Sequence, residues 1–427
     1  MSTELAKHLL NRRAEFPRGP VQQYEDSQGL VPSAGTSQAC RAVPEPTPGA
    51  QEQVRQPWPW RKVLAASLVV KAVCLTLIIG SVWLIPALNQ GAYDRCIHWP
   101  RDGGPTFATH LATWDAAHYL FLSQSGYQKG SHSCAFYPLW PLLIRVCSYA
   151  TGHDPFLAGL FLANLLSVAG WMLFHYLVFS SHGLDVANRA LVLLLAFPGA
   201  LFFSFIYTES LFFLLIVLFF LLLFREKFFW AAVVGFFLPL TKAVGVFAVV
   251  PLLWYLAAHR KPLMAYLACD GPLLGYLCYF VFMRMATGNA VEGFQAQRFF
   301  PNAPSVAHIL DPAGFWSALT APTQLHGMTD SAIDRGLFLL VAASLPFVWR
   351  LDKTYFWYAL LVGVVPAMAS VFLSYTRNMM MCFPLFIVLA LAWRGRVTHL
   401  LFSCALPLLL LAQAWLLLRH INFEWAG

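Results

Sequence analysis

Charged residues are scarce in this 427-residue chain. Asp, Glu, Lys and Arg together make up 11% of it, whereas a soluble domain carries about 25%. Hydrophobic residues make up 59%. From residue 63 onward, apolar runs recur almost to the end of the chain, and about 20 apolar residues are enough to cross a bilayer as a helix. The composition argues against a soluble enzyme and predicts an all-α, polytopic membrane protein.

Several motifs that recruit cofactors are also lacking. The chain has no Gly-rich phosphate-binding loop and no dinucleotide fingerprint, so a cytosolic nucleotide donor is not indicated. No Cys/His spacing suggests zinc, and no DxD-type metal-carboxylate motif occurs. We therefore expect neither a cofactor nor a metal. No basic cluster with interleaved aromatics suggests nucleic acid, so the net charge of +8 fits attraction to anionic headgroups and phosphates instead.

The chain divides into two parts. Residues 1–60 are rich in Pro, Gln, Ser, Gly and charge with little periodicity, which predicts a disordered tail. Residues 61–427 form the predicted membrane domain. Arg61 and Lys62 precede its first apolar run, so the positive-inside rule places them and the tail in the cytoplasm. We expect eleven spanning helices, at about 63–87, 156–181, 189–207, 209–224, 228–240, 243–258, 262–286, 331–349, 354–374, 378–393 and 397–418.

Polar residues collect on the side of the membrane opposite the tail. Two long outer loops, 88–155 and 287–330, are expected there, together with three tight turns that contain Glu209, Lys242 and Arg377. Ionisable groups at membrane depth are costly and usually mark a site or a polar cavity. The structural alternatives are a favourable helix dipole for Glu209, and snorkelling to lipid headgroups for the two cations.

The first outer loop contains the six-residue segment 114–119, with the sequence WDAAHY. Short interfacial helices are expected around 114–122 and 136–145. On a helix, Asp115 lies three residues from His118 and four from Tyr119, so the three share one face. A carboxylate at the membrane surface can act as general base toward a hydroxyl; the alternative is a helix N-cap or a salt-bridge partner. Three roles stay open for His118: it orients Asp115, contacts a phosphate or caps a helix.

Two further pairs of residues stand out in the outer loops. Gln297 and Arg298 offer an amide and a guanidinium to a sugar or a phosphate. Cys96 and Cys134 lie in the same loop, and an oxidising outer face would allow a disulfide that clamps the Asp115 segment.

Several motifs, in order, resemble those of the PIG-V family, the GPI mannosyltransferase II type, over about residues 110–395. Lys242 stands where the family pattern leads us to expect Arg, and Ala243-Val244 replace a more polar pair. The matching motifs are 114–119, Gly126-Tyr127, 135–142 (AFYPLWPL), 207–212 (YTESLF), 240–245 (LTKAVG), 374–377 (SYTR) and Phe383-Pro384.

The resemblance implies a GT-C fold, in which a mannose-type sugar moves from a dolichyl-phosphate or similar polyprenyl-phosphate donor to a lipid-linked or glycan acceptor. The reaction would take place on the non-cytosolic face, at the endoplasmic reticulum membrane of a eukaryote or the inner membrane of a bacterium. Asp115 occupies the position of the essential carboxylate, and we expect inversion at the sugar. Substrate binding is predicted for Trp114, His118, Tyr119, Glu209, Lys242, Gln297, Arg298 and Arg377.

The competing hypothesis is a polytopic transporter or lipid flippase without transferase activity. Lys71 and Asp270, inside predicted spans, are compatible with it, although we interpret both as structural or cavity-lining. Transporters often contain internal repeats, and the 114–142 block is not repeated. A non-catalytic partner of a membrane enzyme is a third hypothesis, under which Asp115 would be dispensable.

Overall fold

The computed structural model describes residues 57–84, 89–301, 303–328 and 330–427, so the predicted tail lies almost entirely outside the described residues. The described part is helical, and its only β-pairing consists of two isolated bridges, His98 with Thr113 and Gln324 with Ser331. The predicted all-α class is therefore confirmed.

By length and composition, five described helices can cross a membrane. Two bent helix pairs, each interrupted by a short break, raise the number to at most seven. The predicted number of eleven is not confirmed. The five long helices are α3 (Trp60–Leu84), α8 (Pro155–His182), the joined pair Leu263–Thr287 that ends in α13, α17 (Ala332–Leu351) and α22 (Arg396–Ile421).

The remaining predicted spans are helical but short or broken. Proline starts the second helix of each bent pair and cannot continue the preceding helix with a backbone hydrogen bond. The first pair, α9 (Leu184–Ala196) and η4 (Pro198–Ser204), bends by 84°. The second, Tyr375–Met381 and α21 (Pro384–Ala392), bends by 81°. The short elements are α10 (Glu209–Phe224), α11 (Phe228–Thr241), Ala243–Ala258 with α12 (Val249–Ala258), α18 (Lys353–Gly363) and α19 (Val365–Ala369).

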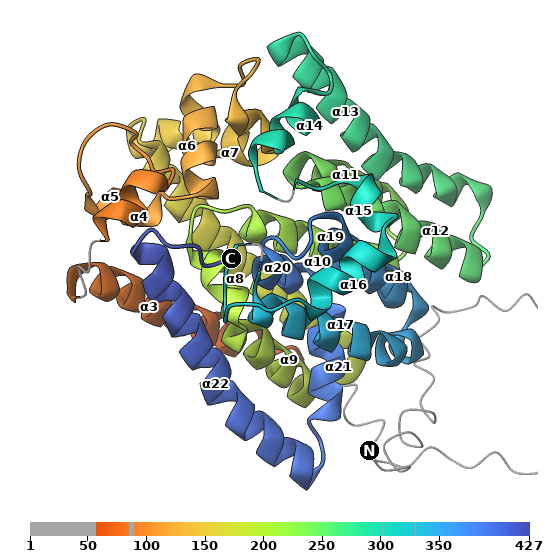
Figure 1. Cartoon of the computed structure of the whole chain (residues 1–427). Coiled ribbons are helices and arrows are strands. Elements are labelled where there is room, and N and C mark those ends of the chain that lie inside the picture. The colour runs from red at the N-terminus through yellow and green to blue at the C-terminus, as the bar shows by residue number, and fades with distance from the viewer. Residues whose placement is uncertain (1–56, 85–88, 302, 329) are drawn as a thin grey trace, which may run out of the picture.

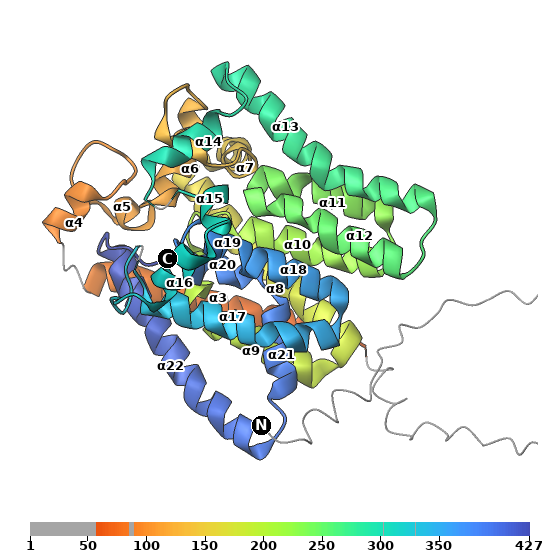
Figure 2. The ribbon, with the colours of Figure 1, turned by 45° about the vertical axis from the view of Figure 1, so that its right-hand side comes forward.

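The two predicted outer loops fold into short helices. Figures 1 and 2 place α4, α5, α6, α7 and α14 together at one end of the bundle. The loops also bond to each other: Glu292 accepts the Gly130 N–H at 2.6 Å, and Gln297 Nε2 donates to Ala135 O at 3.1 Å. In chain order the first loop contains α4 (Gln90–Arg95), α5 (Phe107–Leu111), α6 (Asp115–Ser125), η2 (His132–Ala135) and α7 (Leu139–Ser148). The second loop, which follows α13 (Asp270–Thr287), contains α14 (Glu292–Ala296), η7 (Gln297–Phe299), α15 (Val306–Ile309) and α16 (Pro312–Thr320).

The buried cation on α3 has a structural role. Lys71 Nζ donates to Phe203 O at 3.2 Å and to Ser204 Oγ at 3.1 Å, and it lies 4.3 Å from the centre of the Trp171 ring. A buried ammonium is tolerated only when such partners replace its water. Lys71 thereby ties α3 to the end of η4, five residues before Glu209 begins α10.

Candidate functional site

Asp115, Arg377, Glu209 and Lys242 form a continuous chain of ion pairs. Arg377 Nη1 lies 2.7 Å from Asp115 Oδ2, and Arg377 Nε lies 3.1 Å from Glu209 Oε1. Lys242 Nζ lies 2.8 Å from the same Glu209 oxygen. The four side chains come from the starts of α6 and α10, the C-cap of α11, and α20 (Tyr375–Asn378). The fold thus joins Asp115 to the three charged residues of the predicted outer turns. We name these four residues the charge chain.

The middle of the charge chain is buried and its ends reach solvent. Glu209 is 1% exposed and Arg377 7%, whereas the side chains of Asp115 and Lys242 are 18% and 16% exposed. Buried charges persist only when they are paired, and two acids alternate here with two bases. Glu209 Oε2 is nevertheless buried without a hydrogen-bond partner among the described residues. The two ends of the charge chain, Asp115 and Lys242, are therefore the groups that a ligand can reach.

The backbone before α6 fixes Asp115. Trp114 is the N-cap residue, with φ at +57°, and its side chain makes no capping hydrogen bond. Positive φ is strained for a residue that is not glycine. The Trp114 N–H donates to Ile97 O at 2.7 Å, and the indole packs edge-on against Trp425 at 5.2 Å. Asp115 is thus the first helical residue, held by its neighbour, and does not serve as the N-cap.

Arg377 is held by α17 and by aromatic rings. Asp334 Oδ1 accepts the Thr376 backbone N–H at 2.6 Å and a hydrogen bond from the Thr376 hydroxyl. The guanidinium carbon lies 5.0 Å from the centre of the Tyr207 ring and 5.6 Å from that of Phe202, within the range of cation–π attraction. These contacts fix the turn that carries the guanidinium.

A close backbone approach supports the same turn. A Cβ on Gly199, within η4, would lie 2.5 Å from the carbonyl oxygen of Thr376. The two bent helix pairs therefore meet with their backbones in contact, beside Arg377, and only glycine fits at this point.

Asp334 and Asn378 also belong to the site, although the sequence motifs pointed to neither. Asp334 follows Ser331 by three residues, and Ser331 Oγ caps its N–H at 3.1 Å. An acidic residue in a first helical turn is ordinarily explained by the helix dipole, so no local pattern indicates the tertiary contact. Asn378 Oδ1 accepts from Lys242 Nζ at 3.2 Å. Its place directly after Arg377 was the one available signal.

Tyr119 lies beside the charge chain, but His118 points elsewhere. Burial raises the pKa of Tyr119 well above its usual value, and the charges of Asp115 and Glu209 raise it further, so the phenol stays protonated. His118 Nδ1 lies 2.9 Å from Ser133 Oγ, and its ring stacks on Phe136 at 4.5 Å. No described contact joins His118 to Asp115, so the structure does not support the role of orienting this carboxylate.

The predicted residues of the second outer loop also lie away from the charge chain. Gln297 uses its amide to hold Ala135, and Arg298 is exposed on η7. Neither has a described contact with Asp115 or Arg377. Among the residues that the structure describes, no group of three or more His, Cys, Asp or Glu side chains is arranged to hold a metal ion.

The predicted disulfide is absent. Cys96 and Cys134 are both free and belong to separate apolar clusters. The Cys96 thiol donates to Ile97 O at 3.4 Å, and the Cys134 thiol donates to Gln128 O at 3.1 Å. Burial raises the pKa of Cys96 to about 12 and also raises that of Cys134, so both remain thiols. The 114–119 segment is therefore held by backbone bonds and packing in place of a covalent clamp.

Comparison with known proteins adds a family to this geometry. Residues 105–258 match the family model described as mannosyltransferase (PIG-V), from just before α5 to the end of α12. The match confirms the resemblance predicted from the sequence motifs. It includes Asp115, Glu209 and Lys242, and it ends before Arg377. No curated protein matches the chain.

Proposed function

We propose that this PIG-V-type mannosyltransferase takes mannose from a polyprenyl-phosphate donor and transfers it to a lipid-linked or glycan acceptor on the non-cytosolic face of its membrane. The observation that carries the proposal is the charge chain, in which Arg377 contacts the Asp115 carboxylate while Glu209 holds Arg377 and Lys242. A carboxylate beside two cations suits a reaction that removes a proton and releases a phosphate.

The two cations would receive the donor phosphate. Transfer breaks the bond between the anomeric carbon and a phosphate oxygen, and positive groups placed where that negative charge develops lower the barrier. Lys242 is partly exposed, and Arg377 can exchange one partner for a phosphate without being left unpaired, because Glu209 remains beside it.

Donor binding would also release the base. Arg377 Nη1 lies 2.7 Å from Asp115 Oδ2. A phosphate that attracts Arg377 frees this oxygen for the acceptor hydroxyl. Asp115 then takes the hydroxyl proton, the acceptor oxygen attacks the anomeric carbon, and polyprenyl phosphate leaves with the bonding electron pair. This single displacement inverts the anomeric configuration.

Transfer of labelled mannose by the purified full chain in nanodiscs tests the proposal. With a polyprenyl-phosphate-mannose donor and a panel of lipid-linked and glycan acceptors, we expect product with inverted configuration, and product mass identifies the acceptor. Asp115→Asn should abolish transfer, while Asp185→Asn, an exposed acid at the start of α9, should leave it unchanged. Normal transfer by Asp115→Asn contradicts the base assignment. Movement of lipid across proteoliposomes without any transfer would favour a flippase instead.

A further inference from the structure

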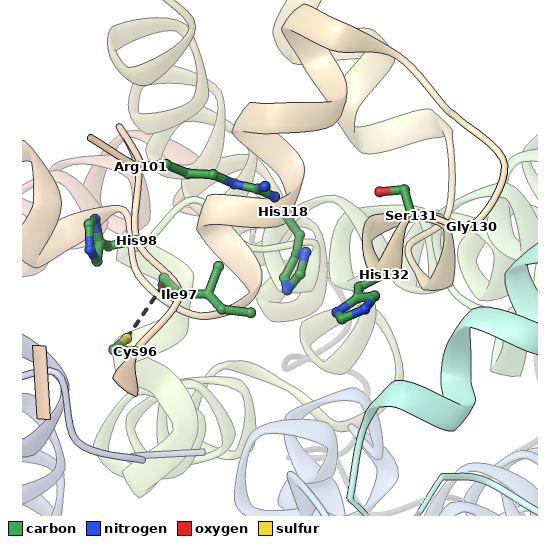
Figure 3. A pocket seen from close by; sticks show the side chains of 8 residues that line it. All are labelled: Cys96, Ile97, His98, Arg101, His118, Gly130, Ser131 and His132. Atoms are coloured by element: carbon green, nitrogen blue, oxygen red, sulfur yellow. Dashed lines mark hydrogen bonds between the residues drawn. The ribbon is translucent and has the colours of Figure 1, made fainter. Parts of the chain in front are cut away.

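A pocket of about 450 Å³ lined by several basic residues adjoins α6, where His118, three residues after Asp115, forms part of its wall. Figure 3 shows His118 between His98 on one side and His132 on the other, with the Arg101 side chain extending toward α6. The backbone of residues 130–131 closes another side. No acidic side chain is among the residues that line it. The proposed reaction uses none of the residues that line this pocket.

The cation in the pocket has no carboxylate partner. Arg101 is exposed, and its guanidinium carbon lies 4.5 Å from the centre of the Phe121 ring. Within the described ranges, no Asp or Glu forms an ion pair with Arg101. An aromatic face orients a guanidinium and leaves its five N–H donors for a ligand. Phosphate is the partner that this fork suits best, because two parallel hydrogen bonds fit its oxygens.

The histidine rings are already oriented. His98 stacks on Tyr93 at 4.3 Å, and its Nδ1 lies 2.8 Å from Pro100 O. His132 stacks on Phe299 at 3.8 Å. Each contact holds a ring in place before any ligand arrives, which reduces the ordering cost of binding.

The loop that closes the pocket is also fixed. The Gly130 N–H donates to Glu292, on α14, at 2.6 Å. His118 is buried, and its pKa is lowered to about 3 by burial and then by the nearby Arg101 and His132. His118 therefore stays neutral, and the permanent positive charge among the residues that line the pocket belongs to Arg101.

We propose that this pocket binds an anionic group of the acceptor, a phosphate or phosphodiester close to the hydroxyl that receives mannose. The inference rests on the proposed function. The donor phosphate is assigned to Lys242 and Arg377, so an anion bound in this pocket would belong to the other substrate. Residues 115 and 118 are three positions apart on α6, which is about 4.5 Å along a helix axis. An acceptor can therefore place an anion in the pocket and a hydroxyl at Asp115.

Acceptor binding, measured without turnover, tests the inference. The full chain carrying Asp115→Asn is placed in zwitterionic nanodiscs with either mannosyl-phosphatidylinositol or mannosyl-diacylglycerol, which share the sugar and the acyl chains and differ in the charged phosphodiester. We expect the charged lipid to bind about tenfold more tightly, the size of one charge-assisted hydrogen bond. Adding Arg101→Gln should remove this preference and leave binding of the neutral lipid unchanged. The matched control is Arg95→Gln, an exposed arginine of α4 outside the pocket.

Three results would overturn the inference. Equal affinity for the two lipids in the Asp115→Asn protein removes the anion site. Equal weakening of both lipids by Arg101→Gln and by His132→Gln shows a structural effect only. Displacement of mannosyl-phosphatidylinositol by the same mole fraction of phosphatidylinositol shows that the pocket takes a bilayer headgroup. Because binding is read without transfer, a wild-type protein that prefers the charged lipid but transfers no mannose refutes the proposed function alone.

Discussion

Arg377 contacts both carboxylates of the charge chain at once, Asp115 through Nη1 at 2.7 Å and Glu209 through Nε at 3.1 Å. The two acids are 94 residues apart in the sequence, and the arginine is a further 168 residues along. A planar guanidinium can address two partners in different directions, whereas an ammonium acts as a point charge. This geometry makes Arg377 the residue on which the charge chain depends.

Arg377→Lys should therefore be nearly inactive. Loss of a preorganised charge-stabilising donor typically costs about 10²–10³-fold in rate, and we expect a fall of that size in kcat. Initial rates of mannose transfer measure it, with thermal unfolding as a check on folding. Arg350→Lys, an exposed arginine near the end of α17, is the matched control. A kcat within threefold of wild type, roughly 0.6 kcal/mol, would show that the fork geometry is unimportant.

Lys242 should act mainly on the donor. Lys242→Met leaves Glu209 with Arg377 as its partner and removes a cation from the exposed end of the charge chain. We expect KM for the donor to rise about tenfold or more, from the loss of a charge-assisted contact. Lys242→Arg should retain most activity, because it keeps the cation. A Lys261→Met control removes an ion pair with Glu226 in a loop distant in sequence and should have no effect. An unchanged KM in Lys242→Met would contradict the assignment.

Asp334 is expected to position Arg377. Asp334→Ala leaves the buried Thr376 N–H without its acceptor, which costs about 1–3 kcal/mol of folding stability. It should also lower kcat, because the α20 turn loses its anchor. Asp334→Asn keeps an oxygen that can accept the Thr376 N–H, so it should retain most of the folding stability and most of kcat. Unfolding in denaturant and initial rates provide the two readouts. A stable but fully active Asp334→Ala protein would exclude the positioning role, and Asp270→Ala, an exposed acid, is the control.

Stability should fall in mild acid because of His118. Its folded pKa is about 3 while its ordinary value is 6.5, so below pH 6.5 the unfolded chain binds a proton that the folded protein excludes. Each pH unit between these values then costs about 1.4 kcal/mol for this single group. Denaturant unfolding at pH 7.5 and pH 5.0 measures the loss, and His118→Gln should reduce it. The exposed His259→Gln should not. If the free energy of unfolding falls equally between pH 7.5 and pH 5.0 in wild type and in His118→Gln, groups other than His118 cause the acid sensitivity.

Transfer should continue in the presence of a metal chelator. Two side-chain cations, Arg377 and Lys242, already stand where the leaving phosphate is expected. We expect rates in EDTA to equal those without it, and added Mg²⁺ or Mn²⁺ to give no increase. A rate that is lost in EDTA and recovered with one divalent ion would require a metal in the mechanism.

Motifs located the charged residues of the site, but they did not reveal which of these residues form ion pairs with one another. Asp115, Glu209, Lys242 and Arg377 were found because charged residues are rare in an apolar chain. Their pairing depends on how separate helices meet, which no local pattern records. Asp334 escaped notice for the same reason, since a first-turn acid is explained locally by its own helix.

Helix existence was more predictable than helix continuity. Every segment predicted to span the membrane contains helix, because apolar composition was the signal. The helices break at Pro198 and Pro384, whereas α17 continues through Pro346. The sequence does not indicate which proline interrupts a helix and which is tolerated within one. The orientation of His118 was missed because a shared helix face does not decide which neighbour a ring chooses; Ser133 and Phe136 supplied closer partners than Asp115.

The contact between Gly199 and Thr376 limits where this protein can diversify. Because the backbones of the two bent helix pairs are in contact here, position 199 admits no residue larger than glycine. The backbone around Arg377 can therefore adopt only one arrangement. The short helices of the two predicted outer loops are restricted unevenly: a Cβ on Gly91, in α4, would meet no atom closer than 3.5 Å, whereas one on Gly293, in α14, would lie 1.9 Å from the Tyr279 hydroxyl. If the proposed function holds, a change of acceptor is open to evolution through α4, while the turn that carries Arg377, and with it the handling of the sugar donor, stays constant.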